Sequence, residues 1–394
     1  MKNARNVSCG KTARPGNTGT DTEMHMNIIF VIAGIFLAFI IGAAVSSAAV
    51  GREAKKEVTS GKYVRNPDYE HLVSGTIFQL SAEGQSLMEQ AYNTAMKQVL
   101  FMQHLCEDPQ EKDWEKKTGK DGEPQMYCRG KRVALISDVD DTLVDGAHYT
   151  CNIIAENGDW NNAAFARFVM SEGCTALPGA VDFINAAKDA GIEIFYVTNR
   201  QDQGYKAGQK DSVSSYEETA GPEKKGAYIA ADGTEIGTSI YQIFGKSMYD
   251  ISMESMERLG FPVDDRHLII NDGKLHGSSK EPARNAIRNG AASYPNGQRE
   301  GENSIRSALT VDLEPHFIAM YLGDQMTDFT DDFSREGMDA AGRAALVEKY
   351  AEKFGTQWIL LPNAMYGQAV DSGISFGPKK LFRKFAGWAK RVFD

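Results

Sequence analysis

Beyond residue 130, short apolar runs alternate with segments whose apolar positions recur at helical spacing. The helical segments PGAVDFINAAKDAG and DISMESMERLG each end in a glycine, and Pro178 opens the first. Parallel strands joined by helices produce this alternation. We therefore expect an α/β fold with a parallel sheet flanked by helices. The apolar runs predicted to be strands are 133–137, 192–197, 267–270, 317–322 and 358–361.

A helix is predicted upstream of the first strand. In SAEGQSLMEQAYNTAMKQVLFMQHL, apolar residues recur at helical spacing and Ser81 opens the segment. This pattern predicts an amphipathic helix of about twenty residues. The next stretch, EDPQEKDWEKKTGKDGEPQ, is rich in charge and contains Pro and Gly. We expect it to break the helix.

The N-terminal part of the chain has a different character. Residues 26–51 carry no charged side chain, and this segment is long enough to be a transmembrane anchor or a signal peptide. Residues 1–25 are polar and expected to be disordered, and 52–75 are expected to form a linker. Lys and Arg flank the apolar segment on both sides, so the orientation of an uncleaved anchor stays open.

The remainder, residues 76–377, is expected to be the folded domain. Two stretches within it, 201–247 and 289–314, are rich in Gly, Ser and charge and are predicted to be surface insertions. Residues 378–394 form a basic amphipathic pattern that predicts a C-terminal helix. That helix would lie on an anionic membrane, dock on the domain, or pack on a second subunit in a homo-oligomer.

Small residues lie near the end of segment 26–51, and the run Ser46 to Ala49 suits signal peptidase. This favours an exported protein at the cell surface or in the periplasm, either anchored or released. In an oxidising compartment the four later cysteines would permit up to two disulfides, and otherwise they would stay thiols. Their pairing is open. These cysteines are Cys106, Cys128, Cys151 and Cys174.

The net charge of the chain limits the kinds of binding partner that we expect. The chain of 394 residues has a net charge of -10, and 42% of its residues are hydrophobic, which is enough for a large core. Proteins that bind nucleic acid in general carry a basic face to engage phosphates, so we expect no nucleic-acid partner. A small anionic substrate would need local cations at its site.

Polar residues follow each predicted strand directly. In an open parallel sheet, ligands bind beyond the carboxyl ends of the strands. We therefore expect these residues to converge on one crevice. They are Asp138, the run Thr198-Asn199-Arg200, Asn271-Asp272, Gly323-Asp324 and Pro362-Asn363.

The acidic residues at these strand ends indicate phosphoryl transfer. Asp138 and Asp140 are two positions apart, so in an extended segment their side chains point to the same side. Carboxylates this close repel one another unless a cation separates them, and oxygen ligands suit Mg²⁺. Asp324 would add a third carboxylate. One carboxylate could then attack phosphorus while the other transfers protons, with Thr198 and Lys280 as candidates to stabilise the phosphoryl charge.

At this point the motifs resemble a known family. DVDDT (138–142) and GDQMTDF (323–329) are similar to the first and last acidic motifs of the haloacid dehalogenase (HAD) superfamily. SAEGQSLMEQAYNTA, PGAVDFINAA, FYVTNR, YLGDQMTDF and FGTQWILLPNAMYG resemble, in order, the class C acid phosphatases, which include bacterial surface lipoproteins acting as 5'-nucleotidases. The resemblance covers roughly 75–367. It implies a HAD-like Rossmannoid sheet with a small helical cap, and a phosphatase of phosphate monoesters, nucleoside 5'-monophosphates among them.

The resemblance also implies roles for single residues. Asp138 would be the nucleophile and Asp140 the general acid and base. Thr198 would donate a hydrogen bond to the phosphate, and Lys280 would stabilise its charge. The implied Mg²⁺ ligands are Asp138, the backbone carbonyl of Asp140, and Asp324, with Asp328 in support.

Four further residues are expected to bind substrate. Asn199 and Arg200 adjoin Thr198 in FYVTNR. Trp160 and Tyr366 match the aromatic positions that flank a nucleotide base in the family's nucleotidases. Ordinary hydrophobic packing is the alternative role for these two aromatic side chains.

The chain departs from the family pattern at several points. Asp141 stands where members usually have Glu, and Gly146 where Asn or Thr is common. The lipid-anchor cysteine of the bacterial lipoproteins is missing, and the two insertions exceed the usual length near the cap. These departures remove no group that the chemistry needs, but they could shift substrate preference.

Two other functions were weighed. A catalytically idle surface-binding or storage protein on the same fold would be expected to lack the nucleophile or the lysine, and both are present here. A phosphotransferase would use the same residues and pass the phosphoryl group to an alcohol. Hydrolysis is the favoured hypothesis.

Overall fold

The protein is described here by a computed structural model that covers residues 70–156, 160–206, 228–229, 235–271, 277–300, 306–334, 338 and 340–366. The predicted tail 1–25, the apolar segment 26–51 and the predicted helix 378–394 lie outside the described residues. None of the helices in the described ranges is both long and apolar enough to span a bilayer.

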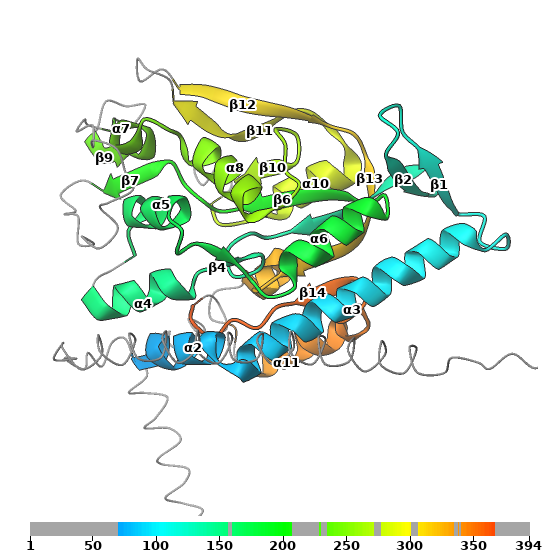
Figure 1. The fold of residues 1–394 in the computed structure, drawn as a ribbon, viewed down its shortest axis with the longest axis horizontal. Coiled ribbons are helices and arrows are strands. Elements are labelled where there is room, and N and C mark those ends of the chain that lie inside the picture. The colour runs from blue at the N-terminus through cyan, green and yellow to red at the C-terminus, as the bar shows by residue number, and fades with distance from the viewer. Residues whose placement is uncertain are drawn as a thin grey trace, which may run out of the picture. The chain divides into compact units, whose positions relative to one another are not determined.

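Five parallel strands form the centre of the main sheet (Figure 1). They pair in the spatial order β10, β6, β3, β13 and β14. All five correspond to apolar runs predicted from the sequence, with bounds that differ by at most two residues. Their bounds are β3 (Lys131–Ser137), β6 (Glu193–Thr198), β10 (Leu268–Ile270), β13 (His316–Gly323) and β14 (Trp358–Leu360).

Helices cover both faces of this sheet. In β3, Val133 and Leu135 belong to one buried cluster and Ala134 and Ile136 to the other, because successive side chains of a strand point to opposite faces. The first cluster includes residues of α3 and α6, and the second includes residues of α10. The result is a helix–sheet–helix arrangement, which confirms the predicted fold class.

The helices begin and end at recognisable signals. The Ser81 hydroxyl accepts the Gly84 amide at 3.1 Å and caps α3, and Gly260 ends α8 in a left-handed conformation. The α-helices are α2 (Glu70–Leu80), α3 (Ala82–Glu107), α4 (Ala147–Glu156), α5 (Asn162–Met170), α6 (Ala180–Asp189), α7 (Ile240–Phe244), α8 (Met248–Leu259), α10 (Glu281–Asn289) and α11 (Ala340–Lys349). Short 3-10 turns are η2 (Met326–Asp328), η3 (Asp331–Ser334) and η4 (Ala351–Lys353).

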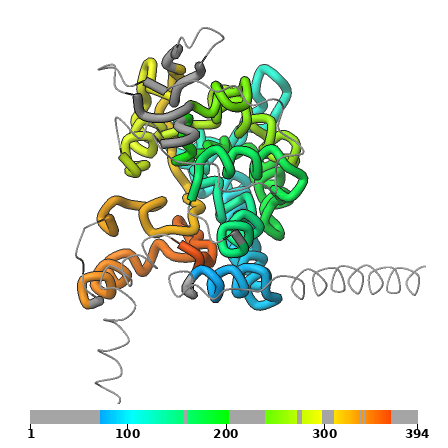
Figure 2. Tube along the Cα trace, turned by 90° about the vertical axis from the view of Figure 1, so that its left-hand side faces the viewer, coloured from blue at the N-terminus to red at the C-terminus, as the bar shows by residue number. Residues whose placement is uncertain are grey.

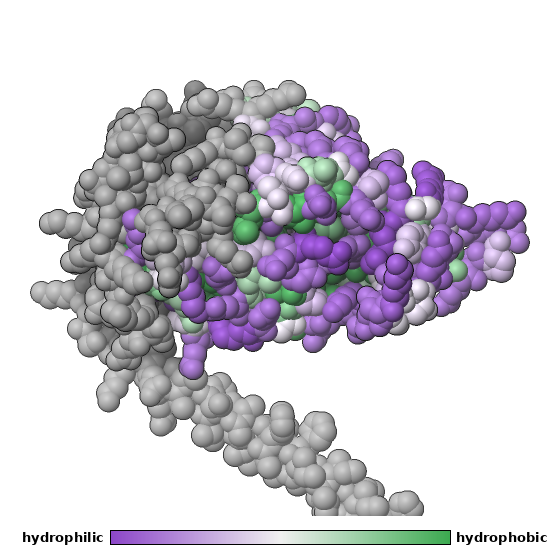
Figure 3. All heavy atoms as spheres, turned by 90° about the horizontal axis from the view of Figure 1, so that it is seen from above, coloured by the Kyte–Doolittle hydropathy of each residue, from purple (hydrophilic) through white to green (hydrophobic). Residues whose placement is uncertain are grey.

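The charged stretch after α3 is not a simple break. It forms an antiparallel hairpin of β1 (Trp114–Thr118) and β2 (Pro124–Cys128), and β2 pairs with the start of β3. All of β1 after its first residue is exposed, so its sequence has no apolar alternation from which a strand could be predicted. From above, the surface toward this end of the sheet is mainly hydrophilic (Figure 3).

The two predicted insertions contain regular structure. Residues 289–314 largely form a hairpin of β11 (Ala291–Glu300) and β12 (Arg306–Leu313), whose Tyr294 and Val311 are buried against the sheet. The expectation of a plain surface excursion is therefore wrong for this stretch. Residues 201–247 contribute α7 and a small sheet of β7 (Gln203–Lys206), β8 (Tyr228–Ile229) and β9 (Glu235–Ser239). The remaining short strands, β4 (Val144–Asp145) and β5 (Thr175–Ala176), pair with each other.

The predicted linker 52–75 ends too late, because residues from Glu70 onward are in α2. Gly75 packs so closely that a Cβ atom there would lie 2.1 Å from the Ala364 carbonyl oxygen. The first described helices thus lie beside the last described residues, as Figures 1 and 2 both show. Residues 70–75 belong to the folded domain.

The four cysteines after the apolar segment are free thiols in the structure. Cys128 and Cys174 are buried, and Cys151 is exposed. Of the alternatives left open by the sequence, this conformation corresponds to the thiol form.

A partly buried ionic cluster lies at the amino ends of the central strands. The Glu193 carboxylate accepts His267 Nε2 at 2.9 Å and His316 Nε2 at 3.0 Å, and it lies 3.4 Å from the Arg132 guanidinium. His267 Nδ1 lies 2.6 Å from Asp264 Oδ1, so both ring nitrogens of His267 face carboxylates. Burial lowers the pKa of His267, but its hydrogen bonds to Asp264 and Glu193 outweigh burial and raise it. The cluster therefore favours the imidazolium form of His267.

This cluster predicts that acid stabilises the fold. A histidine whose pKa is raised by folding contributes its full stability below the unfolded pKa of about 6.5, and loses it as pH rises through the folded value. We expect the urea midpoint of unfolding to be higher near pH 5.5 than near pH 9, and His267→Gln to reduce this difference. His104→Gln, at the exposed end of α3, is the control. An unchanged pH dependence in His267→Gln would contradict the assignment.

Candidate active site

The carboxyl ends of the central strands bring the predicted polar residues together. Asp138 directly follows β3, and Asp324 directly follows β13, the neighbouring strand. The Asp138 amide donates to the Leu322 carbonyl at 3.0 Å, which continues the pairing of the two strands up to the site. The rigid ladder therefore sets the distance between the two carboxylates.

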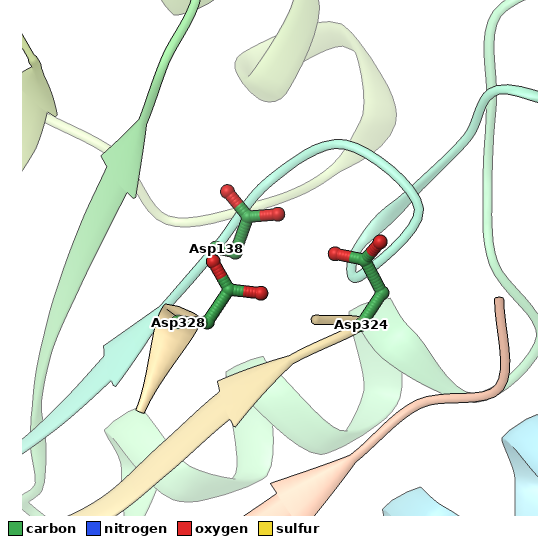
Figure 4. Close-up of side chains that lie close together, drawn as sticks. All are labelled: Asp138, Asp324 and Asp328. Carbon is green, nitrogen blue, oxygen red and sulfur yellow. The ribbon is translucent and has the colours of Figure 1, made fainter. Parts of the chain in front are cut away.

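Three buried carboxylates form the centre of the site. One oxygen each of Asp138, Asp324 and Asp328 can be chosen so that all three lie within 4.8 Å of one another. Their side chains turn toward a common point at the strand ends (Figure 4). The residues are only 7–8% exposed. The sequence prediction that Asp138 and Asp324 meet at one centre is met by this geometry.

Lys280 places one positive charge beside this cluster. Its Nζ donates to Asp328 Oδ1 at 2.7 Å and also to Asp138 Oδ1. Lys280 immediately precedes α10, and a Pro at the start of that helix follows it. Three carboxylates and one ammonium would leave a surplus negative charge buried at this point.

Burial and the surplus negative charge raise the pKa values of these carboxyl groups. Burial, with the charges of Asp328 and Asp140, raises the pKa of Asp138 to about 6, although Lys280 lowers it. Burial and the neighbouring carboxylates also raise the pKa of Asp324 well above its usual range. A cation bound between these oxygens would relieve this repulsion, and hard oxygen donors suit a divalent ion such as Mg²⁺.

Two residues without a role predicted from the sequence hold Asp324 in place. Thr142 Oγ1 donates to Asp324 Oδ1 at 3.1 Å and lies 3.4 Å from Asp138 Oδ2. Asn363 Nδ2 donates to Asp324 Oδ2 at 2.7 Å. The threonine of DVDDT and the polar end of β14 were the sequence signals for them.

The second aspartate of the motif is held by an arginine. Arg200 donates from Nη2 to Asp140 Oδ1 at 2.7 Å and from Nε to Asp140 Oδ2 at 3.0 Å. Thr198 Oγ1 lies 3.4 Å from Asp140 Oδ2, so Thr198 also borders this carboxylate. The guanidinium expected to bind substrate is thus engaged with Asp140.

Asn199 links two strand ends. Its side-chain oxygen Oδ1 accepts Asn271 Nδ2 at 2.8 Å, and its side-chain nitrogen Nδ2 donates to the Ser278 backbone carbonyl at 3.2 Å. Asn271 also donates to the Ser279 carbonyl at 2.9 Å. This network fixes the segment immediately before Lys280.

Tyr366 and Asp141 form a buried pair. The Tyr366 hydroxyl donates to Asp141 Oδ2, and the Gly146 amide donates to Asp141 Oδ1 at 3.0 Å. A Cβ atom on Gly146 would lie 2.7 Å from the Asp141 carboxylate, so these two departures from the family pattern occur together. Burial raises the pKa of Asp141 to about 8, against both hydrogen bonds.

Trp160 belongs to an aromatic group on the other side of the site. It is 50% exposed and packs on Phe165 with ring centroids 4.8 Å apart. Phe165 in turn lies 5.7 Å from the Arg200 guanidinium. Trp160 is therefore linked to Asp140 through Phe165 and Arg200, and half of its surface is exposed.

Comparison with known proteins supports the family expected from the sequence motifs. Residues 68–214 match the model of the acid phosphatases of HAD superfamily subfamily IIIB. This range includes Asp138, Asp140, Trp160, Thr198 and Arg200.

Two solved structures are also similar to this chain. A class C acid phosphatase from Bacillus anthracis with tungstate bound is 19% identical, with a TM-score of 0.45, over 75% of this chain and 85% of that one. A second structure of the class C acid phosphatase from Bacillus anthracis is 18% identical, with a TM-score of 0.47, over 79% and 91%. Values this low add nothing to the functional assignment.

The family match and the motif residues that it contains agree with the family expected from the sequence. Within the match, the DVDDT motif lies at the end of β3 and supplies Asp138 to the acidic cluster. Residues 68–214 therefore match the subfamily IIIB acid phosphatases of the HAD superfamily, and this match supports a phosphoric monoester hydrolase.

Proposed function

We propose that this protein is a Mg²⁺-dependent acid phosphatase that hydrolyses nucleoside 5'-monophosphates through an aspartyl-phosphate on Asp138. The observation that carries the proposal is the meeting of Asp138, Asp324 and Asp328 within 4.8 Å, with Lys280 bound to two of them. Such a centre suits a transferred phosphoryl group, whose negative charge needs cations beside an oxygen nucleophile.

The donor set fits a hard divalent cation. Carboxylates of Asp138 and Asp324 would hold it, with the backbone carbonyl of Asp140 as a further ligand expected from the family resemblance. Asp328 accepts the Gln325 amide at 2.9 Å and Lys280 at 2.7 Å, so we assign it a supporting role. When bound, the ion would neutralise the carboxylates and the phosphate oxygens, so that an anionic nucleophile can approach an anionic ester.

The protein's own groups then perform two displacements. An oxygen of Asp138 attacks phosphorus, the ester P–O bond breaks, and Asp140 gives its proton to the leaving oxygen. In the second step Asp140 takes a proton from water, the water oxygen attacks phosphorus, and the bond to Asp138 breaks. Lys280 and Thr198 stabilise the equatorial oxygens in both steps.

Nucleotides are supported by the aromatic group beside the site. Trp160 is half exposed while its ring contacts Phe165 and Tyr149, so part of the ring is accessible to a flat partner. Bases stack on such surfaces. The Tyr366 hydroxyl is bound to Asp141, which leaves Trp160 as the stronger candidate of the two for stacking.

The other functions are less well supported. An idle storage protein would not be expected to retain Asp138, Asp140, Lys280 and Asp324 together. A phosphotransferase would use the same residues, and transfer to an added alcohol in place of water would identify it.

The first test is hydrolysis itself. We expect the purified protein to release phosphate from p-nitrophenyl phosphate and AMP with Mg²⁺, and to lose this activity in EDTA. Asp138→Asn should lower kcat by at least about 10³-fold, because it removes the attacking oxygen's charge. Circular dichroism should show an unchanged fold. Release of phosphate by Asp138→Asn at the normal rate would exclude the proposed nucleophile.

The second test concerns stacking of the nucleotide base on Trp160. Trp160→Ala should raise KM for AMP about tenfold, because stacking of a base on an aromatic side chain contributes about 1–3 kcal/mol. Ribose 5-phosphate, which lacks the base, is the matched substrate, and its KM should stay nearly constant. Equal effects on both substrates would show that Trp160 has only a packing role.

We also propose that the protein is exported. The support is the uncharged segment 26–51 and the small residues at its end. N-terminal sequencing of the mature protein should find either a start just beyond this segment or an uncleaved membrane-bound chain. A full-length chain that stays in the soluble cell fraction would oppose export.

A further inference from the structure

Arg200 has a more specific environment than a substrate-binding residue requires. Its side chain is 1% exposed, whereas that of Asp140 is 22% exposed toward the crevice. Nη2 and Nε bind the two oxygens of Asp140 at 2.7 and 3.0 Å, with a further contact from Nε to Oδ1 at 3.2 Å. This is a two-pronged contact along one edge of the carboxylate.

The rest of the guanidinium is also held. Nη1 donates to Ser252 Oγ at 3.0 Å, and Ser252 is a fully buried residue of α8. One face of the guanidinium lies over Phe165 of α5, 5.7 Å from the ring centroid. Two helices and a strand end thus fix the orientation of Arg200 before any substrate arrives.

We propose that Arg200 is a positioning residue for the general acid and base, and that Ser252 holds Arg200 in that task. This inference rests on the proposed function, because it takes Asp140 as the group that protonates the leaving oxygen. It replaces the expectation that Arg200 binds substrate. The guanidinium donates to Asp140 and Ser252 and is almost completely buried.

Geometry explains why the reaction needs such a residue. A general acid must lie within hydrogen-bond reach of the leaving oxygen, and an aspartate carboxylate otherwise rotates about two side-chain torsions. The planar fork of arginine matches a carboxylate edge, so it restricts both torsions at once. Lysine would supply the charge without the fork.

The experiment varies the leaving group. An ester such as p-nitrophenyl phosphate loses a stable anion and needs little protonation, whereas AMP loses an alkoxide that must be protonated. We measure kcat/KM with Mg²⁺ for both, since this constant includes leaving-group departure but not hydrolysis of the phosphorylated enzyme. For Arg200→Gln we expect a fall of about 10²-fold with AMP and less than about tenfold with p-nitrophenyl phosphate.

Two further variants sharpen the result. Arg200→Lys, like Arg200→Gln, should lower kcat/KM more for AMP than for p-nitrophenyl phosphate, because a point charge does not fix the carboxylate plane. Ser252→Ala leaves the Arg200–Asp140 pair intact and should show a smaller effect of the same kind, which tests the proposal even if Arg200→Gln folds poorly. Arg258→Gln is the control, since Arg258 on α8 binds the Val169 and Cys174 carbonyls and not Asp140.

The outcomes are distinct. A fall in kcat/KM that is much larger for AMP, absent in Arg258→Gln, supports the positioning role. Equal falls for both esters, or full rescue by Arg200→Lys, would mean that Arg200 supplies charge to the phosphate or stability to the fold, and would overturn it. A wild-type protein that hydrolyses neither ester would instead refute the proposed function.

Discussion

The structure depends on the burial of three carboxylates: Asp138 and Asp324 at the ends of adjacent strands, and Asp328 in the turn η2 that follows β13. Buried like charges repel strongly, so this arrangement persists only because cations and hydrogen-bond donors surround it. Lys280 joins Asp138 to Asp328, and Asn363 and Thr142 donate to Asp324. The remaining negative charge would suit the site to a divalent cation, and that cation would in turn attract an anionic ester.

The parallel sheet makes this burial possible. Strands β3 and β13 are neighbours in the centre of the sheet, and their pairing continues to the Asp138 amide. Helices on both faces exclude water from the strands and keep the carboxylates at a set separation. At the amino ends of the same strands, Glu193 joins Arg132, His267 and His316. Ionic contacts therefore link the strands at both ends of the sheet.

Two ion pairs give the two aspartates of the motif different environments. Lys280 lies beside Asp138, the proposed nucleophile, while Arg200 holds Asp140, the proposed acid and base. The lysine presents a compact charge to the reaction centre. The arginine presents a fork that orients a carboxylate. The sequence motif contains both aspartates only two positions apart, yet their environments differ because different elements supply the cations.

The sequence by itself determined the central strands, the helix after Ser81 and the meeting of polar strand ends, because continuous apolar runs and helical periodicity reflect local burial. It missed the β1–β2 hairpin and the β11–β12 hairpin, whose exposed and irregular strands carry no such pattern. The partners of Arg200 and Tyr366 could not be predicted either.

Only the tertiary structure decided those partners. Tyr366 and Asp141 are 225 positions apart, and Lys280 and Asp138 are 142 apart. Periodicity describes which side of an element faces the core, but not which distant side chain meets it there. That choice follows from the packing of whole elements, which brings Lys280 to Asp138 and Asp328 and Arg200 to Asp140.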